Sequence, residues 1–128
     1  MAPGATMRVE LVSPEKILYS GEATIVICRP EGGDAAFLPG HAPYLGLLGV
    51  GPVLIRTAEG KEVKAAVHGG FIEVRNNKVT ILSDVAELAT EINVERAREA
   101  KSKAEGGTTS EAVVALRRAN VRLLVAAA

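Results

Sequence analysis

Residues 71–83 read FIEVRNNKVTILS, and this stretch decides the fold class. Apolar and polar residues alternate on both sides of Asn76-Asn77, a pair that tolerates positive φ, which predicts two antiparallel strands joined by a tight turn. Residues 53–68, VLIRTAEGKEVKAAVH, predict a second hairpin with Glu59-Gly60 at its turn. No helical stretch separates these strands, which disfavours a parallel α/β fold.

The stretch before these hairpins is also rich in strand-forming residues. MRVELVS (7–13) alternates apolar and polar side chains, and KILYSGEATIVICRP (16–30) predicts two further short strands. Short strands separated by frequent turn signals are typical of a sandwich or barrel. We expect an N-terminal two-sheet β-sandwich over residues 7–90, preceded by a flexible extension over residues 1–6.

After residue 90 the pattern becomes helical. INVERAREAKSKAE (92–105) is rich in strong helix formers, with Asn93 placed to cap the first turn. Gly106-Gly107 should end this helix. The sequence Thr-x-x-Glu over 108–111 matches a capping box and predicts the start of a second helix that runs to residue 128.

Small and apolar residues form one stripe on each expected helix. The stripes consist of Ala97, Ala100 and Ala104 on the first helix, and Ala112, Leu116, Ala119 and Leu123 on the second. A short link between such helices predicts an antiparallel two-helix hairpin over residues 91–128. Because alanine stripes bury little area, we expect this hairpin to be able to detach and dock again.

Composition excludes several functional classes. The 128 residues carry 15 basic and 15 acidic side chains, so the chain lacks the positive charge of a nucleic-acid-binding domain. The lone Cys28 lies in an apolar run and is expected to be buried.

The N-terminus has no signal-peptide pattern, and the longest apolar stretch, 44–55, is too short to span a bilayer. We therefore expect a soluble cytoplasmic protein without direct membrane insertion.

No arrangement of residues indicates catalysis. His41 and His68 have no partners at metal-ligand spacing, and no nucleophile motif or phosphate-binding glycine loop is present. Acidic residues such as Glu73, Asp84 and Glu87 are scattered and expected to be mostly solvated. We predict a protein that is not an enzyme, needs no cofactor and binds no metal.

One basic cluster lies on the second expected helix. Arg117, Arg118 and Arg122 fall away from the Leu116/Leu123 stripe, on what we take as the exposed side. This surface is either an ordinary solvated face or one that binds carboxylates of a partner, because arginine binds them bidentately.

Five segments, in order, resemble the epsilon subunit of bacterial F-type ATP synthase. They are VELVSPEKILYSGEA (9–23), EGGDAAFLPGHAP (31–43), HGGFIEV (68–74), VTILSDVAEL (79–88) and INVERAREA (92–100). The resemblance implies a non-catalytic central-stalk subunit that binds the gamma subunit and the c-subunit ring and couples proton flow to ATP synthesis. It also implies a mobile hairpin that extends into the alpha/beta head and restrains ATP hydrolysis, at the cytoplasmic face of the cell membrane.

The resemblance assigns roles to particular residues. It implies contacts with the c ring or gamma subunit at Glu31, Gly33, Asp34 and His41, with Ala36 where relatives usually have glycine. Some relatives bind ATP as a regulatory ligand through a motif that Ile92, Asn93, Arg96 and Ala97 match here, with Asn93 replacing an aspartate. Arg118 falls on a position that is basic in relatives. In the relatives, the basic residues there meet an acidic loop of the beta subunit. The alternative hypothesis is a stand-alone β-sandwich that senses nucleotides.

Overall fold

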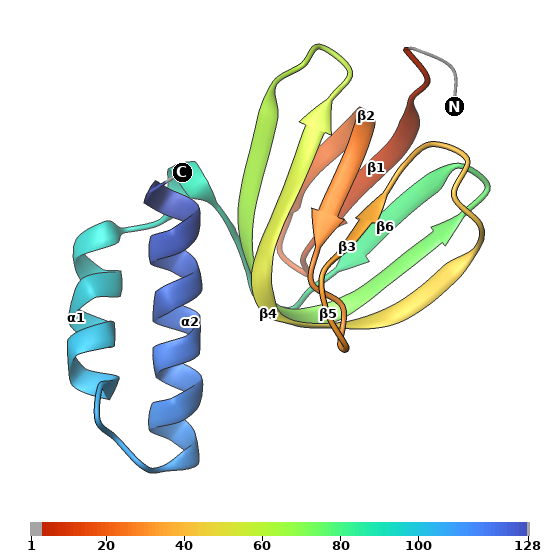
Figure 1. Ribbon diagram of the computed structural model, residues 1–128. Coiled ribbons are helices and arrows are strands. Elements are labelled where there is room, and N and C mark those ends of the chain that lie inside the picture. The colour runs from red at the N-terminus through yellow and green to blue at the C-terminus, as the bar shows by residue number, and fades with distance from the viewer. Residues whose placement is uncertain (1–3, 128) are drawn as a thin grey trace.

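A computed structural model describes residues 4–127 and shows a β domain followed by two helices (Figure 1). The elements in chain order are β1 (Met7–Val12), β2 (Ile17–Cys28), β3 (Ala35–Phe37), β4 (Tyr44–Thr57), β5 (Glu62–Arg75), β6 (Lys78–Leu82), β7 (Ala86–Leu88), the 3₁₀ turn η1 (Ala89–Glu91), α1 (Val94–Ala104) and α2 (Ser110–Ala127). Residues 1–3 of the expected N-terminal extension, and Ala128, lie outside the described residues.

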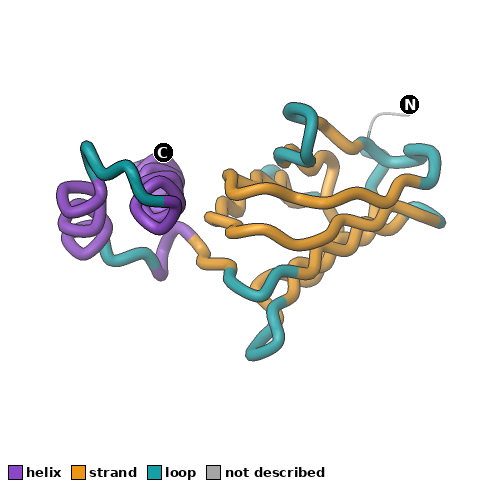
Figure 2. Tube along the Cα trace, turned by 90° about the horizontal axis from the view of Figure 1, so that it is seen from below, coloured by secondary structure: helices purple, strands orange, loops and turns teal. Residues whose placement is uncertain are grey.

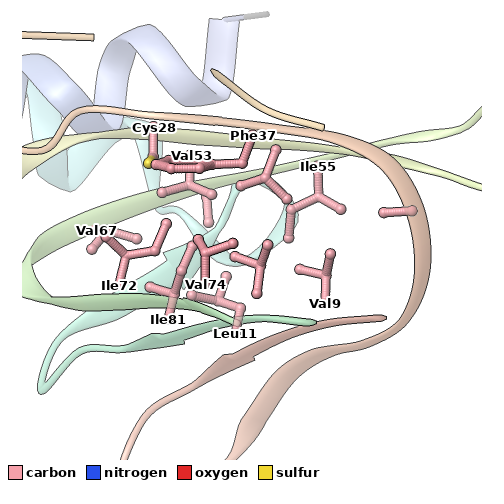
Figure 3. Packing of buried hydrophobic residues seen from close by; sticks show 14 of the residues in the cluster. Val9, Leu11, Cys28, Phe37, Val53, Ile55, Val67, Ile72, Val74 and Ile81 are labelled. Carbon is pink, nitrogen blue, oxygen red and sulfur yellow. The ribbon is translucent and has the colours of Figure 1, made fainter. Parts of the chain in front are cut away.

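The strands form two facing layers around an apolar core, which confirms the predicted β-sandwich. The strand order is β1-β6-β5-β4-β2-β3, β7 pairs with β5, and β1 also pairs with β2, so that hydrogen bonding continues around the domain like a barrel. Most neighbours are antiparallel, while β1 and β6 are parallel. In Figure 3, Cys28, Val53 and Ile55 face Val9, Leu11 and Ile81 across the core.

The two longest strands bend so that each serves both layers. Figure 1 shows β4 and β5 turning together about half-way along their length. The bend in β5 falls at Gly69 and Gly70, which have φ values of 88° and 138°. These glycines lie inside a strand where it changes partner from β7 to β6. Glycine is needed there because a side chain at Gly70 would collide with the end of β6.

Both predicted hairpin turns are confirmed. Asn76 and Asn77 adopt φ values of 51° and 60° between β5 and β6, and Gly60 adopts 87° between β4 and β5. The prediction of two short strands within residues 16–30 is wrong. A single strand, β2, pairs first with β1 and then with β4, and its register shifts between Ala23 and Ile25 as it changes partner.

The two-helix hairpin is also confirmed. Asn93 caps α1, its side-chain oxygen accepting from the backbone N–H of Arg96 at 3.0 Å. The helix ends at Ala104, just before Gly106 with a φ of 78°. The predicted capping box at 108–111 is wrong, because Thr109 caps α2 by accepting from the N–H of Ala112 at 3.1 Å.

Helix α2 lies between α1 and the sandwich (Figures 1 and 2). The buried alanines of the hairpin are Ala97, Ala104 and Ala119. A different face of α2 carries Val121 and Val125, which form a second apolar cluster with Ala66 of β5 and with Ile92. The hairpin is therefore docked on the outer surface of β4 and β5. None of the helices in residues 4–127 has the length and hydropathy needed to cross a membrane.

Candidate functional site

The β2–β3 loop, residues 29–34, presents three of the predicted partner-binding residues in a tight, exposed turn. The N–H of Glu31 donates to the carbonyl of Leu47 at 2.9 Å, which fixes the loop to β4. Arg29 Nε donates to Asp34 Oδ1 at 2.8 Å. Gly33 has a φ of 135°, which favours glycine. The loop is thus a shaped surface in which Glu31 and Asp34 project their carboxylates to solvent.

Ala36, at the position where the resemblance leads us to expect glycine, lies in β3 and is exposed. Among the described residues, Asn76 and Asn77 are the non-glycine residues with positive φ, so alanine fits at this strand position without backbone strain.

His41 lies beyond β3 from Asp34, on the turn that follows this strand. The backbone of the turn is held by Asn77, whose side-chain oxygen accepts from the N–H of Gly40 at 2.9 Å. The His41 ring packs edge-on against Phe37, with ring centroids 4.9 Å apart. His41 is exposed, and its ring lies beside the carbonyl of Ala42.

A groove of about 720 Å³ separates the β2–β3 loop from helix α2. Gly33 and Asp34 line one side, and Leu116, Arg117 and Leu124 line the other. The structure therefore brings the predicted partner-binding loop together with Arg117 of the predicted basic face. These residues are more than 80 positions apart in the sequence, and neither pattern predicted that they line one groove.

A smaller cavity, of about 410 Å³, lies where the hairpin joins the sandwich. Asn93, Arg96 and Ala97 line it, so three of the four residues assigned to ATP binding are together. Ile92, the fourth, is not a lining residue and is buried in the apolar cluster under α2. The remaining lining residues are Glu87, Glu91, Ala100 and Arg122.

Glu87 and Arg122 occupy positions that the sequence did not indicate. Arg122 Nε donates to Glu87 Oε1 at 2.6 Å, and both side chains are less than one-third exposed. The expectation that Glu87 is solvated is wrong, and so is the placement of Arg122 on the exposed side of α2. Partial burial raises the pKa of Glu87, but hydrogen bonds from Arg122 and His68 outweigh it and leave the pKa below its usual value.

His68 completes this group from the face of β5 that the hairpin covers. Its side chain is fully buried, and its Nε2 lies 3.0 Å from the same oxygen, Glu87 Oε1. Because an ionised carboxylate only accepts hydrogen bonds, the Nε2 of a neutral His68 carries the proton. Burial lowers the pKa of His68, although the hydrogen bond to Glu87 works against this effect.

Glu91 also lines the cavity and is held by a contact with the β1–β2 turn. Lys16 Nζ pairs with Glu91 Oε2, and the N–H of Leu88 donates to Glu91 Oε1 at 3.0 Å. The hydrogen bond from Lys16, followed by that from Leu88, lowers the pKa of Glu91. The carboxylate therefore stays ionised and fixed at neutral pH.

The other candidate residues lie apart from this cavity. Arg117 and Arg118 are exposed on α2, as predicted. Cys28 is buried in the core, also as predicted, and burial raises the pKa of its thiol to about 12. Such a thiol is protonated at neutral pH and is a poor nucleophile.

One pattern in the sequence could have revealed His68. Residues 65–68 form four consecutive buried positions in β5, two facing the core and two facing the hairpin. Such a run departs from alternation and is typical of a strand that is covered on both faces. Glu87 had no comparable signal, because its role depends on a helix that begins more than 20 residues later.

Comparison with known proteins identifies the family. The family described as "ATP synthase, Delta/Epsilon chain, beta-sandwich domain" matches residues 6–89. An ATP synthase epsilon chain from Streptomyces avermitilis is 50% identical over 121 residues, covering 93% of this chain and 94% of that protein. The chain belongs to the ATP synthase epsilon chain family. Another epsilon chain, from Brevibacillus brevis, is 49% identical over 105 residues, covering 82% of this chain and 80% of that one.

Solved structures show the same fold as this epsilon-family chain. A chain of the Euglena gracilis mitochondrial ATP synthase, in a structure of its OSCP, F1 and c-ring parts, matches 96% of this chain and 78% of its own length, with a TM-score of 0.74 and 20% identity. A chain from the Tetrahymena thermophila mitochondrial ATP synthase central stalk and c-ring matches with a TM-score of 0.64 and 17% identity, over 96% of this chain and 95% of its own length.

Proposed function

We propose that this chain is a non-catalytic rotor subunit of an F-type ATP synthase. It binds the gamma subunit and the c ring, and through them takes part in coupling proton translocation to ATP synthesis. Family membership is the observation that carries this proposal, since epsilon chains are 50% identical over nearly the full length. It also favours this function over that of a stand-alone nucleotide sensor. The subunit associates with the cytoplasmic face of the membrane peripherally, through the complex.

An exposed apolar row on the sandwich suits the contact with the gamma subunit. Leu47, Phe71 and Leu82 are direct cross-strand neighbours on β4, β5 and β6, and each side chain is about half exposed. Apolar patches of this kind mark protein-protein interfaces in soluble proteins. A row at the middle of a sheet, rather than scattered single side chains, fits a rigid and permanent partner.

The β2–β3 loop suits the contact with the c ring. Glu31 and Asp34 present two carboxylates on a backbone that is already fixed by hydrogen bonds to β4. A loop ordered before binding loses less conformational entropy when it docks. His41 lies at the other end of β3, on a turn that is held by Asn77, and forms a second, separate contact region.

Co-purification with the gamma subunit tests the assembly function. Replacing Phe71 and Leu82 with serine should weaken retention of gamma, because the apolar row loses its centre. Val114→Ser removes an exposed apolar side chain from α2 instead and provides the matched control. Equal retention of gamma by the two variants would show that the apolar row is not the interface.

The hairpin is the part of the chain suited to restraining ATP hydrolysis in the alpha/beta head. Among residues 4–127, its apolar cluster with the sandwich contains four buried residues, whereas the sandwich core contains sixteen. The hairpin should therefore open at a lower free-energy cost than the sandwich unfolds. Arg117 and Arg118 then provide exposed guanidinium groups for carboxylates of the head.

The role of this basic face is best tested with Arg117→Ala and Arg118→Ala together. Arg122 also belongs to the predicted face, but its ion pair with Glu87 makes its replacement disturb docking as well. The double variant should hydrolyse ATP faster in the reconstituted head while assembly stays intact. An unchanged hydrolysis rate would exclude these two arginines from the inhibitory contact.

ATP as a regulatory ligand is proposed for the 410 Å³ cavity. Arg96 and Arg122 provide positive charge for phosphate groups, and the amide nitrogen of Asn93 can donate while its oxygen caps α1. A ligand bound here would touch both the hairpin and Glu87 of the sandwich, and would thus favour the docked state. Calorimetry should detect ATP binding to the wild-type chain and weaker binding to Arg96→Ala. No heat at millimolar ATP would reject this ligand.

A further inference from the structure

The group formed by His68, Glu87 and Arg122 joins three parts of the molecule. His68 comes from β5, Glu87 from β7 and Arg122 from α2, and the two basic side chains share one carboxylate oxygen. We call these three residues the clasp. It is the polar counterpart of the apolar cluster under α2, and it links the sandwich directly to the hairpin.

We propose that the clasp is sensitive to protons through His68, and that it releases the hairpin from the sandwich when the surrounding solution becomes acidic. The effect of this release on ATP hydrolysis rests on the proposed function, because the released hairpin is the one proposed to restrain hydrolysis. The proton-dependent release itself does not depend on that function. In the docked state Arg122 is paired with Glu87. Release of the hairpin therefore also makes Arg122 available for other contacts.

The docked geometry accommodates neutral His68 but not its cation. Neutral His68 donates from Nε2 to Glu87, and no atom of the described residues bonds to its buried Nδ1. Protonation would place a second N–H at Nδ1, where it would have no acceptor, and an unsatisfied buried donor is costly. When the hairpin leaves, the outer face of β5 is exposed and water can satisfy this group.

The balance of charges around His68 also disfavours its protonated form in the docked state. Arg122 and Arg118 of α2 both disfavour the imidazolium, and Glu87 of β7 is the one acidic group acting on it that the described residues provide. Its other neighbours, Val50 on β4 and Val85 in the β6–β7 connection, carry no charge. Undocking removes the two arginines while leaving Glu87 on the sandwich, so the undocked state binds the proton more readily.

The sign of the pH dependence follows from this difference. A histidine whose pKa is lower in the docked state stabilises docking above its undocked pKa of about 6.5, and this stabilisation is lost as the pH falls below that value. If His68 stays neutral while docked, acidification from about pH 7.5 to about pH 5.5 increases the opening constant by up to about tenfold. The pKa of Glu87 is below its usual value, so the carboxylate stays ionised across this interval.

The experiment measures opening of α2 by amide hydrogen exchange in the full chain between about pH 7.5 and about pH 5.5. Rates are corrected for the intrinsic effect of pH, with amides of the β5–β6 hairpin as an internal reference. His68→Gln keeps a donor to Glu87 but does not titrate. The chain has two histidines, so His41→Gln at the exposed turn is the matched control.

The wild-type chain and His41→Gln should show the increase of up to about tenfold, and His68→Gln should respond by less than about twofold. An equal response in His68→Gln, or a flat response in the wild type, would overturn the proposal. If His68→Gln does not fold, NMR titration of His68 in the wild-type chain tests the proposal instead. A pKa of His68 at or above the ordinary histidine value would exclude the clasp as a proton sensor. A flat wild-type response leaves the hydrolysis test of the hairpin unaffected.

Discussion

The bend in β5 makes a sharp prediction about Gly70. A Cβ atom at this position would lie 2.1 Å from the carbonyl oxygen of Leu82 and 3.0 Å from Ser83 Cα, both backbone atoms. Ser83 is itself buried, and its hydroxyl lies 2.5 Å from the carbonyl of Gly69. The end of β6 therefore cannot move away from Gly70→Ala without disturbing this hydrogen bond.

Gly33 offers a matched control, because its φ of 135° is almost the same as the 138° of Gly70. No atom outside its immediate neighbours lies within 4 Å of a Cβ built on Gly33. Gly33→Ala should therefore cost only the backbone strain, about 1–3 kcal/mol. Gly70→Ala should cost the same strain plus an overpacking penalty of about 1–3 kcal/mol or more.

Urea unfolding of the full chain, followed by far-ultraviolet circular dichroism, measures both changes in the free energy of unfolding. We expect Gly70→Ala to lose about 2–6 kcal/mol, a large part of the stability of a domain of this size. Equal losses for the two variants would refute the reasoning, because they would show that backbone conformation alone, and not the approach of β6, requires glycine at the bend.

Three further changes test local features of the structure. Thr109→Ala should destabilise α2 by about 1 kcal/mol and Thr108→Ala by much less, as judged from amide exchange in the first turn, because Thr109 is the cap. Asn77→Ala should speed amide exchange at Gly40, since it removes the acceptor of that N–H and replaces a residue suited to positive φ; unchanged exchange would contradict this. Val121→Ala should lower protection across α2 by about 1–2 kcal/mol while the sandwich core stays protected, and a uniform loss would show that hairpin and sandwich open together.

The sequence predicted features that depend on neighbouring residues. The Asn76-Asn77 turn and the Asn93 cap each follow from side chains that act on the backbone within a few positions. The change from strand to helix near residue 90 follows from a change in composition and period. These signals were enough to predict a sandwich followed by a helical hairpin.

Features that depend on tertiary packing could not be predicted in the same way. Helix α2 carries two apolar stripes, one through Leu116 and Leu123 and another through Val121 and Val125. The second stripe faces the sandwich because Ala66 and Ile92 receive it there, and this choice turns Arg122 toward Glu87. No local pattern in the sequence distinguishes the two stripes.

The rate of ATP hydrolysis by a reconstituted catalytic head tests the central claim most directly. The head is assembled with gamma and either the full chain or a chain that ends at Glu91, which keeps the sandwich and removes residues 92–128. Retention of gamma by both forms confirms equal assembly. A rotor subunit with an inhibitory hairpin predicts faster hydrolysis without residues 92–128, and equal rates would contradict the proposed role of the hairpin.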